Sequence, residues 1–178
     1  MWLHCLSVRQ PFVELILLEL KNGESRCQDW LLSDRKDQYI LLHESNTVDP
    51  EQLKEALKIA ADRNVKVHVQ RRCKTKCAKD QMRGRVVAII KLGETHCLTQ
   101  QDLHTKEDRL FWEHRTFVPT AQLKQNPYVT TIEEVHPFPT PWKMSGQLGL
   151  FPVRVRLRDL PSNLDSEMLE KSLYNPKR

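Results

Sequence analysis

The sequence predicts an α+β fold, a small mixed β-barrel with helices on its flanks. Segments with the alternation or β-branched content of strands recur along the chain, and helical segments lie between them. Few strand–helix–strand units follow one another, so a doubly wound parallel sheet is not indicated. The 178 residues are 39% hydrophobic and 29% charged, which is typical of a globular protein with one core. We expect one domain over residues 1–160 and a polar C-terminal tail over 161–178.

The first element is predicted to be a strand over 2–8, with the sequence WLHCLSV. Pro11 follows it at a position that the first turn of a helix tolerates. The apolar residues of 12–20 then recur at helical spacing. We expect Gly23 to end this helix in the left-handed conformation, and the chain to continue as an extended segment over 24–30.

The middle of the chain supplies the strongest signals. YILLHES (39–45) and GRVVAIIKLGET (84–95) have the composition of strands. Between them, DPEQLKEALKIAADR (49–63) is typical of a helix, with Asp49 as a cap and Pro50 at the first position.

Three further elements complete the prediction. A capped helix is expected over 99–114, and strands over 128–138 and 150–157. In the last strand arginines alternate with apolar residues, which predicts one buried face and one cationic face. Those residues are Val153, Arg154, Val155, Arg156, Leu157 and Arg158. Beyond Pro161 a loose helix and a disordered tail are both compatible with the polar sequence.

The net charge of +5 is concentrated in one stretch. Residues 63–85 contain nine Lys or Arg against one Asp, whereas residues 1–62 contain seven against eleven acidic residues. Such a patch favours a polyanionic partner, and a solvated loop without a partner is the alternative. Within it, VKVHV (65–69) has the alternation of a short strand, and we expect much of 70–83 to be a mobile loop.

Lys21, Glu24 and Arg26 form a compact charged group where the first helix gives way to extended chain. A lysine at a helix end complements the helix dipole, and residues two apart on a strand point to the same face. The three charges are therefore predicted to converge beside the barrel mouth. The alternative is a surface ion pair with a capping lysine, contributing about 0–1 kcal/mol.

The segment CLSVRQPFVELILLELKNGESR (5–26) resembles the opening of the ASCH domain family, in the PUA-like superfamily. Its signature is G-x-K-x-x-E-x-R, which Lys21, Glu24 and Arg26 match, whereas Glu19 replaces the glycine. S-x-R-Q-P (7–11) and the strand over 84–95 look like the eukaryotic branch called endothelium and lymphocyte associated ASCH domain proteins. KMSGQLGLFPV (143–153) resembles the closing strand of the family, with Gly146, Gly149 and Phe151 in their usual places.

The resemblance implies a PUA-like β-barrel with a cleft between barrel and helices. It also implies binding of nucleic acid, chiefly RNA, and for some members a coregulator role. Certain bacterial relatives deacetylate N4-acetylcytidine or cut RNA. The catalytic lysine of the deacetylating group matches Lys21, but a threonine stands where this chain has Glu24, so that mechanism is not carried over.

The leading hypothesis is a nucleic-acid-binding module, with RNA favoured over DNA. Lys21 and Arg26 would engage a phosphate or a base edge, and Glu24 would orient them or accept from an exocyclic amine. Trp142 is a candidate for stacking on a base, against plain packing in the core or rim. The other expected contact residues are Arg9, Arg71, Arg72, Lys74, Lys76 and Lys143.

Two alternatives stay open. In the first, the protein is a hydrolase acting on a modified nucleoside or on RNA, with Lys21 as base or nucleophile and Glu24 activating water. In the second, it is a protein-interaction or coregulator module that docks through the 99–114 helix and the polar tail, so protein partners are also expected.

The remaining chemistry is sparse. Five cysteines without a signal-peptide pattern favour free thiols in the cytoplasm or nucleus, and no apolar run has the roughly 20 residues of a membrane helix. Cys73 and Cys77 lack a second pair at zinc-finger distance, so we expect neither metal nor cofactor. His43 is a packed or rim histidine, or one that reaches substrate from a strand beside the cleft. A monomer is expected.

Overall fold

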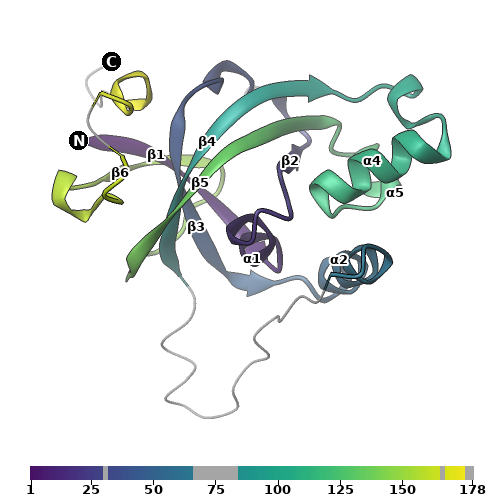
Figure 1. Ribbon diagram of the computed structural model, residues 1–178, viewed down its shortest axis with the longest axis horizontal. Helices are drawn as coiled ribbons and strands as arrows, with labels where there is room; N and C mark the ends of the chain where they lie inside the picture. Colours follow the sequence, from purple (N-terminus) through teal and green to yellow (C-terminus); the bar gives the residue numbers. More distant parts are fainter. Residues whose placement is uncertain (30–31, 66–83, 165–166, 175–178) are drawn as a thin grey trace, which may run out of the picture.

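The computed structural model describes residues 1–29, 32–65, 84–164 and 167–174. Its six strands form one twisted mixed sheet in the order β2-β5-β4-β3-β1-β6 (Figure 1). Their bounds are β1 Trp2–Gln10, β2 Gly23–Arg26, β3 Tyr39–Val48, β4 Arg85–Cys97, β5 Tyr128–Lys143 and β6 Leu150–Arg154. β1 and β3 are parallel, and the other neighbours are antiparallel. The predicted α+β, PUA-like fold is confirmed, although the edges β2 and β6 do not pair to close the barrel.

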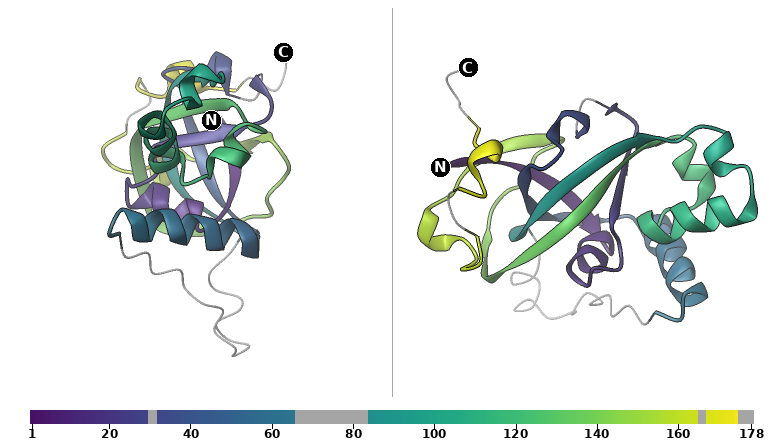
Figure 2. Two further views of the ribbon diagram at one scale, coloured as in Figure 1. Left: turned by 90° about the vertical axis from the view of Figure 1, so that its right-hand side faces the viewer. Right: turned by 45° about the horizontal axis from the view of Figure 1, so that its top comes forward.

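Among the described residues, four α-helices lie mainly toward one end of the sheet, and the C-terminal segment lies at the other (Figures 1 and 2). They are α1 Phe12–Leu17, α2 Pro50–Asp62, α4 Lys106–Thr116 and α5 Thr120–Leu123. Short 3-10 turns cover Ser33–Arg35, Gln101–Leu103, Leu157–Asp159 and Glu170–Ser172.

The local sequence determines where α2 and α4 begin. The Asp49 carboxylate accepts hydrogen bonds from the backbone N–H groups of Glu51 and Gln52, and Pro50 opens α2 as predicted. α4 begins later than the predicted residue 99, because Thr105 and Asp108 form a capping box in which each side chain accepts from the other's backbone N–H.

Helix α1 ends differently from the prediction. Gly23 is a residue of β2, and Glu19 takes the left-handed conformation with a φ of 56°. The N–H of Glu19 donates to the carbonyl of Ile16, and the N–H of Leu20 donates to that of Leu15. These two bonds define a Schellman motif. Glu19 thus adopts the left-handed conformation at the position where the family signature has glycine.

The strands bury both of their faces, so the core has two parts. Along β1, Leu6 and Val8 face one cluster while Leu3 and Cys5 face the other, as the period of two requires. The larger cluster includes buried residues of α1 and α2, with partly buried Trp112 of α4 against it. The smaller cluster includes Phe151 of β6 and the C-terminal residues Leu164 and Leu169.

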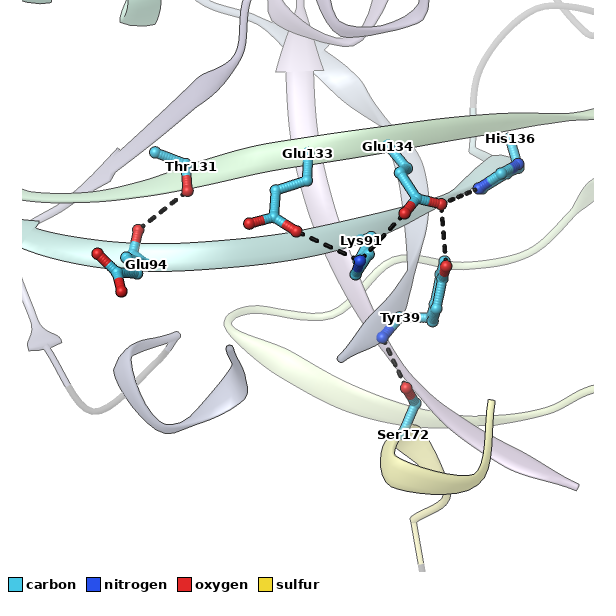
Figure 3. A network of polar contacts seen from close by, with 8 residues as sticks. All are labelled: Tyr39, Lys91, Glu94, Thr131, Glu133, Glu134, His136 and Ser172. Atoms are coloured by element: carbon cyan, nitrogen blue, oxygen red, sulfur yellow. Dashed lines mark hydrogen bonds and ion pairs between the residues drawn. The ribbon is translucent and has the colours of Figure 1, made fainter. Parts of the chain in front are cut away.

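The described residues after Pro161 pack against the sheet. Leu169 is buried, Leu173 forms a β-bridge with Leu3, and the N–H of Tyr39 donates to the Ser172 hydroxyl at 2.6 Å. The Ser172 contact is drawn in Figure 3. This part of the predicted tail is therefore anchored to the sheet by apolar burial and by a hydrogen bond.

The predicted alternation holds along β6 and for two residues beyond its end at Arg154. Val153 and Val155 are buried and Arg154 and Arg156 are exposed, so one face is apolar and the other cationic. The prediction was wrong at Leu157, which is 58% exposed because the strand has ended and a 3-10 turn has begun.

Two predicted segments lie in part of the chain that the structure does not describe. VKVHV beyond Val65 and the loop expected over 70–83 lie outside the described residues. Within the described residues, every helix is too short or too polar to cross a lipid bilayer.

Candidate functional site

A polar cavity of about 530 Å³ lies between the sheet and the helices. Its walls come from the ends of β1, β2 and β3, from α1, α2 and α5, and from the loop before β6. Lys21, Glu24 and Arg26 all line it, so the structure brings together the three charges that the sequence singled out. The side-chain amides that line it belong to Asn46, Gln52, Gln122, Asn126 and Gln147.

Lys21 is the most buried of these charges, with only 2% of its surface exposed. Its ammonium donates to the carbonyls of Gly23 and Thr116 and lies 3.3 Å from a carboxylate oxygen of Glu24. Burial lowers the pKa of Lys21, and the nearby Glu24 carboxylate partly offsets that effect. With three donors and three acceptors, the ammonium has all of its hydrogens committed inside the protein.

Glu24 connects Lys21 to the cavity. Its other carboxylate oxygen lies 2.7 Å from Nη2 of Arg26. Burial alone would raise the pKa of Glu24, but the charges and hydrogen bonds of Arg26 and Lys21 outweigh it and hold that pKa below its usual value. Glu24 is therefore an ionised carboxylate with a cation on each side.

The local chain positions this group through close packing. A Cβ on Gly23 would lie 3.1 Å from Val129 and 3.3 Å from Thr116, so the strand start fits tightly between β5 and the end of α4. The N–H of Asn22 donates to the carbonyl of Arg115 in the same region. The chain after α1 is thus fixed against α4, which supplies the Thr116 carbonyl for Lys21.

The accessible cations of the cavity are the two arginines. The side chain of Arg26 is 30% exposed, and that of Arg9 is 50% exposed and lies 3.5 Å from Asp49. Sequence reasoning named both. It missed the side-chain amides, because they come from four separate segments and carry no common motif.

His43 lines the cavity although it is only 1% exposed. Its Nε2 lies 2.9 Å from the Met144 carbonyl, which can only accept, so Nε2 carries a hydrogen. In the neutral ring Nδ1 is then an acceptor, and the Ser7 hydroxyl donates to it at 2.9 Å. His43 is therefore packed, as one interpretation had it, and it also lies at the cavity wall. Its contact with Ser7 was missed because 36 residues separate the two in sequence.

The other predicted contact residues lie elsewhere. Lys143 is exposed at the end of β5, opposite Arg85, and is not part of the cavity wall. Trp142 packs edge-on against Phe138 at 4.7 Å and contacts the smaller core cluster, so the packing interpretation describes it. Outside the described residues lie Arg71, Arg72, Lys74, Lys76, Cys73 and Cys77.

Comparison with known proteins supports the fold assignment. The structure is similar to the crystal structure of an ASCH protein from Zymomonas mobilis, with a TM-score of 0.51 and 11% sequence identity, over 94% of this chain and 91% of that chain. No family model and no curated protein matches the sequence. At this identity the likeness shows the fold: the chain is an α+β protein with the architecture of an ASCH domain.

Proposed function

We propose that the protein is a member of the ASCH family and binds nucleic acid, with RNA preferred, by taking an unpaired nucleotide into the cavity. One observation carries the proposal: a cavity of about 530 Å³ that combines two partly exposed arginines with several side-chain amides. Arginines match phosphate geometry, and amides and arginines match the donor and acceptor edges of bases.

Arg26 is the central contact in this proposal. Glu24 binds Nη2 of its guanidinium at 2.7 Å, and the side chain of Arg26, 30% exposed, lines the cavity. Arg9 supplies a second cation on the wall formed by β1. Single-stranded RNA is recognised through unstacked bases that enter such pockets, while cations outside track the backbone.

Lys21 and Glu24 act here as positioning residues. The Lys21 hydrogens are bonded to Gly23, Thr116 and Glu24, so its charge fixes the buried carboxylate and does not contact the ligand. Glu24 in turn orients Arg26. This differs from the direct contact with a phosphate or a base edge that the sequence suggested for Lys21.

The basic stretch over 63–85 would extend the binding surface. Its described end, Gly84, lies against Asn46, with a Cβ there only 2.9 Å from the Asn46 amide oxygen, and Asn46 lines the cavity. The stretch therefore rejoins the described fold, at Gly84, beside a residue of the cavity wall. Cations that contact a bound strand add affinity that falls with salt.

Binding of a fluorescent single-stranded RNA, measured by anisotropy against salt concentration, tests the proposal. We expect log Kd to depend linearly on log salt, with a slope of about 0.7 per phosphate contact. R26A should weaken binding by about tenfold or more. R156A is the matched control, because Arg156 pairs with Asp159 outside the cavity. Salt-independent binding, or equal effects of R26A and R156A, would refute the proposal.

The hydrolase roles suggested for Lys21 and Glu24 receive less support from the geometry. Lys21 has no free hydrogen or exposed lone pair with which to act as base or nucleophile, and Glu24 is held between two cations.

A further inference from the structure

The loop over residues 145–149 forms one wall of the cavity and carries an exposed apolar side chain, Leu148. Residues 146–149 line the cavity, and the side chain of Leu148 is fully exposed. The other aliphatic and aromatic residues of the wall are buried, and they are Val8, Phe12 and Val118. Among the residues that line the cavity, Leu148 is therefore the large apolar side chain that the protein leaves uncovered.

Both ends of this loop are attached to the sheet. At its start, Nε2–H of His43 donates to the Met144 carbonyl at 2.9 Å, and the Met144 N–H donates to the carbonyl of Gly84 at 2.7 Å. The Ser7 hydroxyl holds the opposite side of the imidazole, because it donates to Nδ1 at 2.9 Å. At its other end the loop enters β6, which pairs with β1 from Leu150 onward.

Two glycines determine how the loop passes between these ends. A Cβ at Gly146 would lie 2.5 Å from Cε1 of His43 and 2.6 Å from the Ser7 oxygen, which is closer than side-chain atoms pack. Gly149 has a φ of 77°, in the left-handed region that favours glycine. Gly146 thus lets the backbone lie directly on the Ser7–His43 pair, and the pair fixes the position of the loop that carries Leu148.

We propose that Leu148 covers one face of the nucleobase that enters the cavity, and that the Ser7–His43 pair positions the loop for this contact. The inference rests on the proposed function and adds to it which part of the nucleotide the loop recognises. A base has polar edges and apolar faces. The side-chain amides and Arg26 suit the edges, whereas a face needs an apolar partner, which Leu148 supplies on the solvent side of the cavity.

The hydrophobic effect gives this contact its selectivity. Covering the side chain of Leu148 removes apolar surface from water, and the base removes its own apolar face from water at the same time. A phosphate group offers no such surface. The loop therefore favours strands that carry bases over the phosphodiester chain alone, whereas cations of the cavity also respond to the phosphates.

Fluorescence anisotropy with two strands of equal length tests the assignment. One is a single-stranded RNA, and the other is a ribose–phosphate chain that lacks bases, with low salt to keep the phosphate contribution measurable for both. L148A should weaken binding of the RNA by about tenfold and leave binding of the abasic chain unchanged. L148F should bind the RNA as the wild type does, because a phenyl ring also covers the face of a base.

L157A is the matched control for this experiment. Leu157 is 58% exposed, follows β6 and is not part of the cavity wall, so its removal should leave binding of both strands unchanged. Thermal unfolding of L148A should match that of the wild type, because the protein buries none of the Leu148 side chain. A loss of RNA binding in L148A then reports a lost contact with the RNA and not a damaged fold.

Two further variants test the positioning role of the Ser7–His43 pair. G146A adds a methyl group where the loop lies on the pair, and it should weaken RNA binding about as much as L148A does. S7A removes the hydroxyl that bonds Nδ1 of His43, and it should weaken RNA binding by a smaller factor. Both variants should bind the abasic chain like the wild type, and S7A decides the point if G146A does not fold.

The inference is overturned if L148A binds the RNA as tightly as the wild type, or if it loses affinity equally for both strands. If folded S7A and folded G146A bind the RNA like the wild type, the positioning role of the pair is wrong. RNA binding that is lost in R26A but kept in L148A refutes this inference and leaves the proposed function intact. A wild-type protein that binds neither strand refutes both.

Discussion

Two glutamates organise charged networks in different parts of this protein. Glu24 lies at the cavity, its side chain 10% exposed, between Lys21 and Arg26. Glu134 lies on β5, its side chain 36% exposed, and binds Lys91, His136 and the Tyr39 hydroxyl (Figure 3). Glu24 binds cations two and three residues away, whereas Glu134 joins segments distant in sequence. The Glu24 network lines the cavity of about 530 Å³.

The network at Glu134 ties the sheet to the C-terminal segment. The Asn163 amide donates to Nδ1 of His136 at 2.7 Å, so Nε2 of that ring carries the hydrogen that it donates to Glu134. Burial and, to a smaller extent, the hydrogen bond to Glu134 raise the pKa of Tyr39 to about 12. The phenol therefore stays a donor at neutral pH. Every described member has a partner in the protein, which is the pattern of a structural network.

The comparison teaches what distinguishes a candidate site from a scaffold. In the Glu24 network the innermost cation is fully satisfied, but Arg26 remains partly exposed toward the cavity. In the Glu134 network the charges are satisfied by each other near the solvent, where screening weakens them. The feature that marks the candidate site is therefore a charged side chain, held in place by a buried ion pair, at the wall of a cavity.

The largest expected difference between the networks comes from the lysines. K21M leaves the Gly23 and Thr116 carbonyls without their donor and removes one cation from buried Glu24, so we expect a loss of about 3–5 kcal/mol. K91M should cost much less, because solvent reaches that ion pair. Urea unfolding of both variants measures the difference, and equal losses would contradict it.

The next effect is the pH dependence of Glu24. Its pKa is lowered in the folded state, so its stabilisation is fully present above the unfolded value of about 4.3 and is lost as pH falls through the folded value. E24Q should destabilise the protein by about 2–3 kcal/mol at pH 7 and by less in acid. Urea unfolding across the acid range checks this. A constant loss at every pH would show that the Glu24 charge is not responsible.

The anchor of the C-terminal segment should have a smaller effect. S172A leaves the Tyr39 N–H, which is buried, without its 2.6 Å acceptor, and we expect a loss of about 1–2 kcal/mol. S45A, which changes an exposed hydroxyl, is the control and should have almost no effect on thermal unfolding. If S172A unfolds like the wild type, the anchor is dispensable.

The smallest expected effect is a gain. Glu19 holds a φ of 56°, which strains a residue with a side chain, so E19G should stabilise the protein by about 1 kcal/mol. E19A keeps the Cβ and should not stabilise it. Chemical unfolding compares the two, and a gain with E19A would refute the backbone explanation.

Sequence alone was sufficient for the elements that local patterns encode. β3, β4 and α2 occur where alternation, β-branched residues and the Asp49–Pro50 start predicted them. The convergence of Lys21, Glu24 and Arg26 also followed from short-range spacing. The sequence did not predict where α1 ends. Glycine at 23 was the stronger local signal, but the left-handed turn lies at Glu19 instead.

Only the tertiary structure decided which groups are buried, bonded and accessible. Lys21 is capped by the carbonyl of Thr116, which is 95 residues away, and Ser7 reaches His43 only because β1 and β3 pair in parallel. The sequence by itself determined the local conformations and the charges available. The cavity required long-range pairing, since burial and hydrogen-bond satisfaction depend on neighbours that no local pattern names.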